Sequence, residues 1–175
     1  MEHWKNSRIV YEGRIVRLRV GEVELDDGST AEREVIEHPG GVCVAPWTGE
    51  SVILVRQFRI ALNAHVLEVP AGKLEPGDSP ALRAACELEE ETGYVARTLE
   101  PAGAVYATVG YCSEQIHFFL GLGLEKTAQR LEPEERIELV EMPLDDVRQG
   151  LAENTFTDSK TVIALERLLR HIGSG

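Results

Sequence analysis

The sequence predicts an α/β (α+β) fold, with strands and helices layered around one core and a small antiparallel β sub-domain at the N-terminus. Apolar and polar residues alternate through the N-terminal segment. A helix-forming segment interrupts a series of strand-like segments in the middle of the chain, and an amphipathic helical pattern closes it. With 175 residues, of which 43% are hydrophobic, the chain is long enough for one domain with a real core.

The N-terminal segment carries the clearest β pattern. Residues 13–38, GRIVRLRVGEVELDDGSTAEREVIEH, alternate on either side of Asp27-Gly28, a pair that favours a hairpin turn. The segment HPGG then breaks the pattern, so we predict a sub-domain at 1–38 and a main domain at 39–175. A sheet of so few strands buries too little apolar area to be stable alone. We therefore expect it to pack on the main body or on a second subunit.

The main domain begins with two apolar segments, 41–47 and 51–59, which are typical of buried strands and are joined by the turn TGES. A short strand at 65–72 leads into a helix at 79–92. Ser79 is the predicted N-cap of this helix, Pro80 its first residue and Gly93 its stop. The remaining elements are three strands followed by two helices, predicted at 98–107, 116–122, 136–141, 143–154 and 157–173.

Composition limits the classes of partner. The net charge of −12 argues against binding to nucleic acid or to an anionic membrane, because both reward clusters of Lys and Arg. The three cysteines, Cys43, Cys86 and Cys112, suggest neither a disulfide framework nor a zinc site. The sequence has no signal-peptide pattern and no apolar segment of membrane-spanning length. We expect a reducing, cytoplasmic location.

The helix predicted at 79–92 is unusually acidic. Glu87 and Glu91 are four residues apart and Glu90 is three residues from Glu87, so the three carboxylates share one face. We expect Leu82 and Ala85, with Leu88, to form the opposite, buried face. Carboxylates this close repel one another unless a cation compensates them, and carboxylate oxygens are ligands for Mg²⁺ or Mn²⁺. A plainly solvated acidic face is the alternative.

The spacing around this helix closely resembles the Nudix box, G-x5-E-x7-R-E-U-x-E-E-x-G-U, where U is a bulky aliphatic residue. The matching residues are Gly72, Glu87, Leu88, Glu90, Glu91 and Gly93, with Tyr94 at the last position. The resemblance implies a Nudix α/β/α sandwich with a mixed sheet and a metal-dependent hydrolase of a nucleoside diphosphate linked to another moiety. It also implies that Glu87, Glu90, Glu91 and the carbonyl of Ala71 bind Mg²⁺, with Mn²⁺ as the alternative. Such metal ions neutralise and orient the pyrophosphate and activate water.

Two residues depart from this box. Asp78 stands where the box has Glu, and Cys86 stands where it has Arg. In the family that arginine pairs with a box carboxylate, and a thiol can neither form an ion pair of this kind nor supply five donors. We therefore expect a less compensated acidic cluster, with Cys86 as a small packing residue rather than a reactive thiol.

Further segments look like the ADP-ribose pyrophosphatase branch of the family: LVRQFR, EVPAGKLEPG, GYCSEQIHFFL and TFTDSKTVIAL. This resemblance implies hydrolysis of ADP-ribose to AMP and ribose 5-phosphate, and a homodimer formed through residues 1–38. Hydrolysis of another nucleoside diphosphate sugar, a GDP-hexose or UDP-hexose, is one alternative. A non-catalytic module that binds a nucleotide ligand is the other, and the departure at Cys86 keeps it open.

The same resemblance suggests residues that contact substrate. Arg56 and Arg59 end a strand that leads towards the site, and a guanidinium suits a phosphate group. We favour Arg56, because Arg59 could equally form a surface ion pair. Glu114 occupies a loop that lies beside the substrate in relatives.

A second acidic segment, LEPEERIEL at 131–139, matches the mobile loop that supplies the catalytic base in this branch. We predict Glu135 as the base and Glu134 as the second candidate, against the alternative of a solvated loop. Tyr11, Trp47 and Tyr106 are candidates to stack on adenine, and the sequence does not choose among them.

Overall fold

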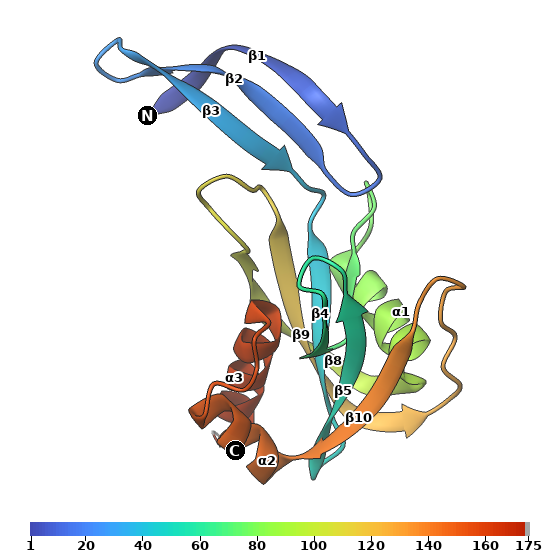
Figure 1. Ribbon diagram of the computed structural model, residues 1–175. Helices are drawn as coiled ribbons and strands as arrows, with labels where there is room; N and C mark the ends of the chain where they lie inside the picture. Colours follow the sequence, from blue (N-terminus) through green and yellow to red (C-terminus); the bar gives the residue numbers. More distant parts are fainter. Residues whose placement is uncertain (174–175) are drawn as a thin grey trace. The chain divides into compact units, whose positions relative to one another are not determined.

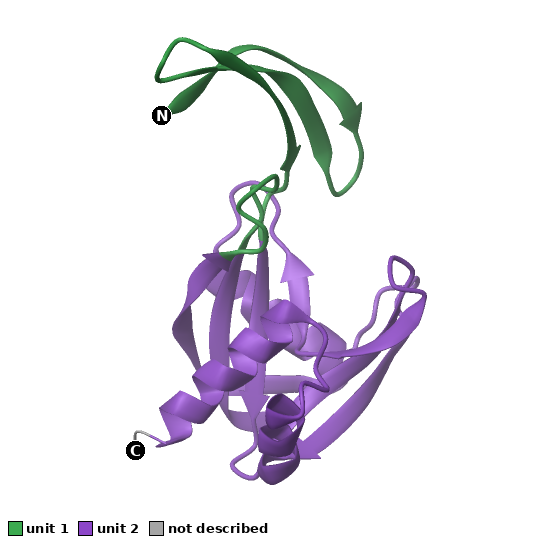
Figure 2. Cartoon of the chain, turned by 60° about the vertical axis from the view of Figure 1, so that its left-hand side comes forward, with its two compact units in different colours: residues 1–40, 106–115 green, residues 41–105, 116–175 purple. Residues whose placement is uncertain are grey.

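The computed structural model describes residues 1–173, which form two compact units (Figure 2). The N-terminal unit comprises residues 1–40 together with residues 106–115. The larger unit comprises residues 41–105 and the chain from residue 116 onward. The later segment is tied to the N-terminal one because Ile36 N–H donates to Tyr111 O at 2.7 Å and Ser113 N–H donates to Ile36 O at 2.9 Å.

The N-terminal unit is an antiparallel sheet in the order β1-β2-β3, formed by Glu2–Glu12, Arg17–Leu25 and Thr30–Glu37 (Figure 1). The predicted hairpin turn is confirmed. Gly28 has a φ of 80°, which glycine adopts without steric cost, and Asp27 Oδ1 accepts from Ser29 N–H at 2.9 Å. Only Val23 of this sheet is a buried hydrophobic residue among those described.

The larger unit contains a mixed sheet in the order β10-β5-β4-β9-β8, with β6 paired to β5 and β7 paired to β4. The β4–β9 pair is parallel, whereas β10–β5, β4–β5, β4–β7 and β5–β6 are antiparallel. The strands are β4 Gly41–Trp47, β5 Ser51–Arg59, β6 Ala64–Glu68, β7 Ala71–Lys73, β8 Tyr94–Tyr106, β9 Gln115–Lys126 and β10 Ile137–Pro143. The predicted strands of this domain are present, except that the one predicted at 65–72 is divided into β6 and β7, and β8 and β9 begin before their predicted first residues.

Three helices cover the two faces of this sheet: α1 Pro80–Thr92, α2 Leu144–Ala152 and α3 Ser159–Gly173. Alternate residues of β4 point to opposite faces. Val42 and Val44 pack with Leu88 of α1, whereas Cys43 and Ala45 belong to the cluster that contains the buried residues of α2 and α3. The predicted α/β/α sandwich with a mixed sheet is therefore confirmed.

Helix α1 begins and ends as predicted, but its buried face differs from the expectation. Leu82 is 70% exposed and Ala85 is also exposed. The buried residues of the helix are Ala84, Glu87, Leu88, Glu91 and Thr92. Two of the acidic side chains thus lie on the face that packs toward the sheet instead of opposite to it.

Helix α1 is followed by Gly93 in the left-handed conformation, with a φ of 68°, and the Gly93 N–H donates to Glu89 O at 2.8 Å. Ser79 precedes the helix but forms no capping hydrogen bond through its side chain. None of the helices in residues 1–173 combines the length and hydrophobicity needed to cross a lipid bilayer.

Candidate active site

The carboxylate of Glu87 lies directly over the backbone of Gly72. A Cβ atom added at Gly72 would be 1.5 Å from Glu87 Oε1 and 2.0 Å from its Cδ. Glycine is needed here because of this close approach. The contact brings β7 and α1 together and leaves the Glu87 side chain only 5% exposed.

Glu91 is held one helical turn further along. Its side chain is also 5% exposed, and its Oε2 accepts a hydrogen bond from Ala71 N–H at 2.9 Å. Burial, together with the charges of Glu87 and Glu135, raises the pKa of Glu91 to about 8, against the lowering effects of the Ala71 hydrogen bond and of Arg59. Burial also raises the pKa of Glu87.

An arginine that precedes the acidic residues compensates part of their charge. Arg83 lies one turn before Glu87, and its Nη2 is 2.5 Å from Glu87 Oε1. Burial lowers the pKa of Arg83, but the charges of Glu87 and Glu90 both raise it and outweigh burial. Arg83 therefore sits among the acidic residues of α1.

The loop between β9 and β10 is attached to the C-terminal end of α1. Thr127 N–H donates to Gly93 O at 2.7 Å, Arg130 N–H donates to Glu90 O at 2.9 Å, and the Gln129 side chain donates to Glu91 O at 2.6 Å. These bonds satisfy carbonyls that a helix end leaves without partners. The loop is thereby fixed beside the acidic face.

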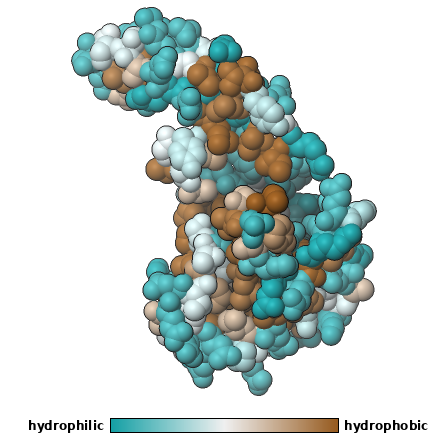
Figure 3. Space-filling view, in the orientation of Figure 1, coloured by the Kyte–Doolittle hydropathy of each residue, from teal (hydrophilic) through white to brown (hydrophobic). Residues whose placement is uncertain are grey.

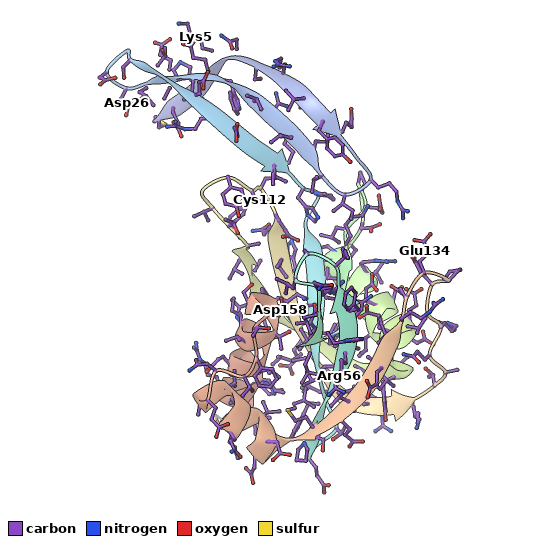
Figure 4. The ribbon with its side chains drawn as sticks, in the orientation of Figure 1. Lys5, Asp26, Arg56, Cys112, Glu134 and Asp158 are labelled. Carbon is purple, nitrogen blue, oxygen red and sulfur yellow. The ribbon has the colours of Figure 1, made fainter. Side chains whose placement is uncertain are left out.

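The structure places Glu135 in this loop near Glu87 and Glu91, because the charge of Glu135 raises the pKa of both. The Glu135 side chain also accepts from Glu132 N–H at 2.8 Å, which closes a tight turn. Glu134 is not among the largest charge effects on either carboxylate, and Figure 4 shows it on the outer part of the loop. The surface of this loop is hydrophilic in Figure 3.

The two candidate arginines of β5 have different surroundings. Arg59 forms a two-bond pair with the buried Glu68, at 2.6 Å from Nε to Oε1 and 2.9 Å from Nη2 to Oε2. Lys160, at the start of α3, contacts the same carboxylate and also Asp158 at 3.0 Å. Burial would raise the pKa of Glu68, but Arg59 and Lys160 hold it below its usual range.

Arg56, which Figure 4 labels, has a different partner. Its side chain is 43% exposed, and its Nη1 lies 3.3 Å from Glu138 of the neighbouring strand β10. Arg59, in contrast, acts on Glu91, whose pKa it lowers. The charge of Arg59 therefore acts on an acidic residue of α1, whereas Arg56 forms an ion pair with Glu138 on β10.

The remaining candidate residues lie apart from this set. Glu114 belongs to the N-terminal unit, where its Oε1 is 3.6 Å from His38 Nδ1. Asp78 accepts from Glu75 N–H at 2.8 Å and stabilises the loop before α1. Cys86 is exposed, beside a shallow depression lined by Ala85, Leu88, Glu89, Val95, Ala96 and Leu99.

The carboxylates fit a hard divalent cation by their chemistry. Glu87 and Glu91 are buried anions that repel each other and Glu135, and a cation among them would remove that repulsion. Within residues 1–173, however, no three His, Cys, Asp or Glu side chains are already arranged to hold a metal ion. In this arrangement one oxygen of Glu87 contacts Arg83 and one oxygen of Glu91 accepts from the Ala71 N–H.

Sequence reasoning missed Arg83, Glu68 and Lys160. The signal for Arg83 was its spacing of four residues from Glu87, which places both on one helical face. The pairing of Glu68 and Lys160 joins residues 92 positions apart. No local pattern could have revealed that contact.

Comparison with known proteins gives the family. The NUDIX domain family matches residues 37–165, and the nucleoside diphosphate sugar hydrolase N-terminal domain matches residues 5–36. The chain is 41% identical over 162 residues to the methanol dehydrogenase activator of Bacillus methanolicus. It is 38% identical over 162 residues to the ADP-ribose pyrophosphatase of Bacillus subtilis (strain 168). Each alignment covers 91% of this chain and 88% of the relative.

A solved structure described as an ADP compounds hydrolase has the same fold. It superposes with a TM-score of 0.87, at 21% sequence identity, and the match covers 99% of this chain and 95% of that one. The box residues, the layered sheet and the matched family together lead to one conclusion. This chain belongs to the Nudix family and is a Nudix pyrophosphohydrolase.

Proposed function

We propose that the protein hydrolyses the pyrophosphate bond of ADP-ribose, giving AMP and ribose 5-phosphate. The observation that carries the proposal is the pair of buried carboxylates, Glu87 and Glu91, held over the backbone of Gly72 and Ala71 in a Nudix chain. The similarity to an ADP-ribose pyrophosphatase over most of the chain supports this substrate. Water attacks one phosphorus atom, the bridging P–O bond breaks, and one proton of the water leaves.

In this proposal Glu87, Glu90 and Glu91, with the carbonyl of Ala71, hold a divalent metal ion, for which we propose Mg²⁺, with Mn²⁺ as the alternative. A bound divalent cation supplies charge neutralisation to the pyrophosphate and makes water more acidic. Glu135 accepts the proton of the attacking water. The charge of Glu135 acts on Glu87 and Glu91, which supports Glu135 as the base. Glu134 is the second candidate for the base.

For the substrate, we propose that Arg59 binds a phosphate oxygen. Glu68 accepts two hydrogen bonds from the Arg59 guanidinium and so fixes its orientation. The Arg59 side chain therefore loses little conformational entropy when substrate binds. The contacts therefore favour Arg59 over our first choice, Arg56. Glu114 remains proposed as a substrate contact from the loop of the N-terminal unit.

A panel of substrates tests the proposal. ADP-ribose, a GDP-hexose and a UDP-hexose are compared by kcat/KM in the presence of Mg²⁺. We expect ADP-ribose to be preferred, and Arg59→Ala to raise KM by about tenfold or more while Arg56→Ala changes it less. A higher kcat/KM for either hexose would replace ADP-ribose with the alternative substrate. Absence of hydrolysis of all three would favour a non-catalytic binding module.

We further propose a homodimer formed through residues 1–38, in a reducing, cytoplasmic setting. The sheet of this segment exposes large apolar side chains, among them Trp4, Tyr11 and Ile15, and Figure 3 shows hydrophobic residues on one of its faces. Light scattering should give the mass of a dimer for the native protein and of a monomer for Tyr11→Glu/Ile15→Glu. Leu82→Glu, at an exposed apolar residue of α1, is the control.

A second candidate function comes from the relative named a methanol dehydrogenase activator. In this alternative the protein stimulates a dehydrogenase. Addition of the native protein to methanol dehydrogenase should then raise its turnover, and Glu91→Gln would show whether the effect needs hydrolysis. Unchanged turnover with the native protein would exclude this function.

A further inference from the structure

We propose that Arg83 is the positioning residue for the metal-binding carboxylate Glu87, in place of the arginine that position 86 lacks. The inference rests on the proposed metal-binding role of Glu87. It concerns a residue outside the box positions that define the family resemblance. Four features of the structure support it: the contact with Glu87, the place of Arg83 on the helix, the unpaired Nε of Arg83, and the surroundings of Cys86.

The contact itself is short, and two groups approach the same oxygen. Arg83 Nη2 lies 2.5 Å from Glu87 Oε1, and the backbone of Gly72 also approaches this oxygen closely. Glu87 is buried, and the Arg83 side chain is 33% exposed, so water screens the pair only weakly. Without Arg83, the buried Glu87 carboxylate would have to change its rotamer or bind another donor, because an unpaired buried charge is costly.

The place of Arg83 on α1 centres it on the acidic face. Residues three and four apart in a helix are neighbours, and Glu87 follows Arg83 by four residues. Glu90 follows it by two turns, and the charge of Glu90 acts on the guanidinium. Arg83 therefore interacts with the charges of both Glu87 and Glu90, which lie on the same helix.

The Arg83 guanidinium also has one N–H donor that is not used in a hydrogen bond within the described residues. Arg83 Nε is buried and has no hydrogen-bond partner among the described residues. An unpaired buried donor is costly, and most proteins avoid one. This nitrogen can bond to a carboxylate that reorients when the cation binds, which is consistent with a positioning role beside ligands that must move.

Cys86 cannot supply this cation, because a thiol carries no positive charge. Its exposed side chain borders the depression formed with Val95 and Leu99, on the side where α1 approaches β8. Arg83 therefore provides Glu87 with a cation in place of the missing box arginine, while burial, Glu90 and Glu135 still raise the pKa of Glu87.

Binding of Mn²⁺ alone tests the inference, measured from the electron paramagnetic resonance signal of free Mn²⁺ in the presence of the full-length protein. We expect Arg83→Ala to raise the dissociation constant for Mn²⁺ by about tenfold or more, as removal of the partner of a metal ligand does. Arg83→Lys should recover part of the loss, because an ammonium group at the same position still pairs with Glu87. Cys86→Arg alone should change the constant less than about threefold.

Arg148→Ala is the matched control, because Arg148 also forms a helical ion pair, at 2.9 Å with Asp145 on α2. It should bind Mn²⁺ like the native protein. Unchanged or tighter Mn²⁺ binding by Arg83→Ala would overturn the inference while leaving the proposed function intact. If the native protein bound no Mn²⁺, the proposed metal site would fail, and the inference with it. Thermal unfolding of each metal-free variant verifies that the fold is retained.

Discussion

The substitution Gly72→Ala tests the contact on which the candidate site is built. An added Cβ would lie 1.5 Å from Oε1, 2.0 Å from Cδ and 2.5 Å from Cγ of Glu87. All three atoms belong to the outer part of one flexible side chain. We therefore expect the backbone of β7 to remain in place while the Glu87 carboxylate is expelled from its position.

The size of the displacement follows from the contact distance. Real Cβ atoms essentially never come within 3.0 Å of such neighbours, so the nearest oxygen has to move by at least about 1.5 Å. A shift of about 1 Å at a catalytic group can cost roughly 100-fold in rate. The movement also breaks the 2.5 Å contact with Arg83. We expect kcat/KM to fall by about 100-fold or more, with a change in unfolding free energy within about 2 kcal/mol.

The assay compares Gly72→Ala with Gly173→Ala, at which an added Cβ meets no atom within 4 Å. Initial rates with ADP-ribose are measured over a series of Mg²⁺ concentrations, and unfolding is followed in urea. The expected pattern is loss of activity without loss of fold in the first variant, and no change in the second. Native-like activity and metal dependence of Gly72→Ala would refute the geometry described for Glu87.

Three further predictions concern titration, catalysis and reactivity. Because burial raises the pKa of Glu91 from 4.5 to about 8 in the folded protein, its contribution to the stability of the metal-free protein is full below pH 4.5 and is lost as the pH rises to 8. The loss amounts to at most about 1.4 kcal/mol per pH unit, and urea unfolding at several pH values should show a flatter slope for Glu91→Gln. Equal slopes would contradict the raised pKa. Glu135→Gln should lower kcat by roughly 100-fold or more, and Glu134→Gln by only a few-fold; the reverse order would exchange their roles. Burial raises the pKa of Cys43 to about 12, so iodoacetamide should modify the exposed Cys86 and leave Cys43 unmodified, as peptide mass spectrometry can show; modification of folded Cys43 would contradict its burial.

The fold could be predicted to a large extent because its signals are local. Asp27-Gly28 determines a hairpin, Pro80 and Gly93 delimit α1, and alternation of apolar residues marks the strands. The error in the buried face of α1 had a physical cause. Apolar Leu82 was expected inside and Glu87 outside, whereas the structure buries Glu87 beneath Arg83 and over Gly72.

The candidate site could be predicted only where its residues are neighbours in the sequence. The spacing of Glu87, Glu90 and Glu91 predicts that they share one helical face, and the structure buries Glu87 and Glu91 of the three. The environment of Arg59 depends on Glu68 and on Lys160, which arrives from α3 through tertiary packing. Long-range pairing of this kind leaves no periodicity in the sequence. The sequence therefore gives no sign that Glu68 orients Arg59, and without that sign Arg56 is the better candidate.

The hydrolysis of ADP-ribose is tested most directly by product formation with the native protein and with Glu91→Gln, the products being separated by chromatography and identified by mass. We expect equal amounts of AMP and ribose 5-phosphate from the native protein, only when a divalent metal ion is present. Glu91→Gln, with an unchanged fold, should form almost none. Formation of products by Glu91→Gln at the native rate, or turnover by the native protein after the metal has been removed by a chelator, would contradict the account.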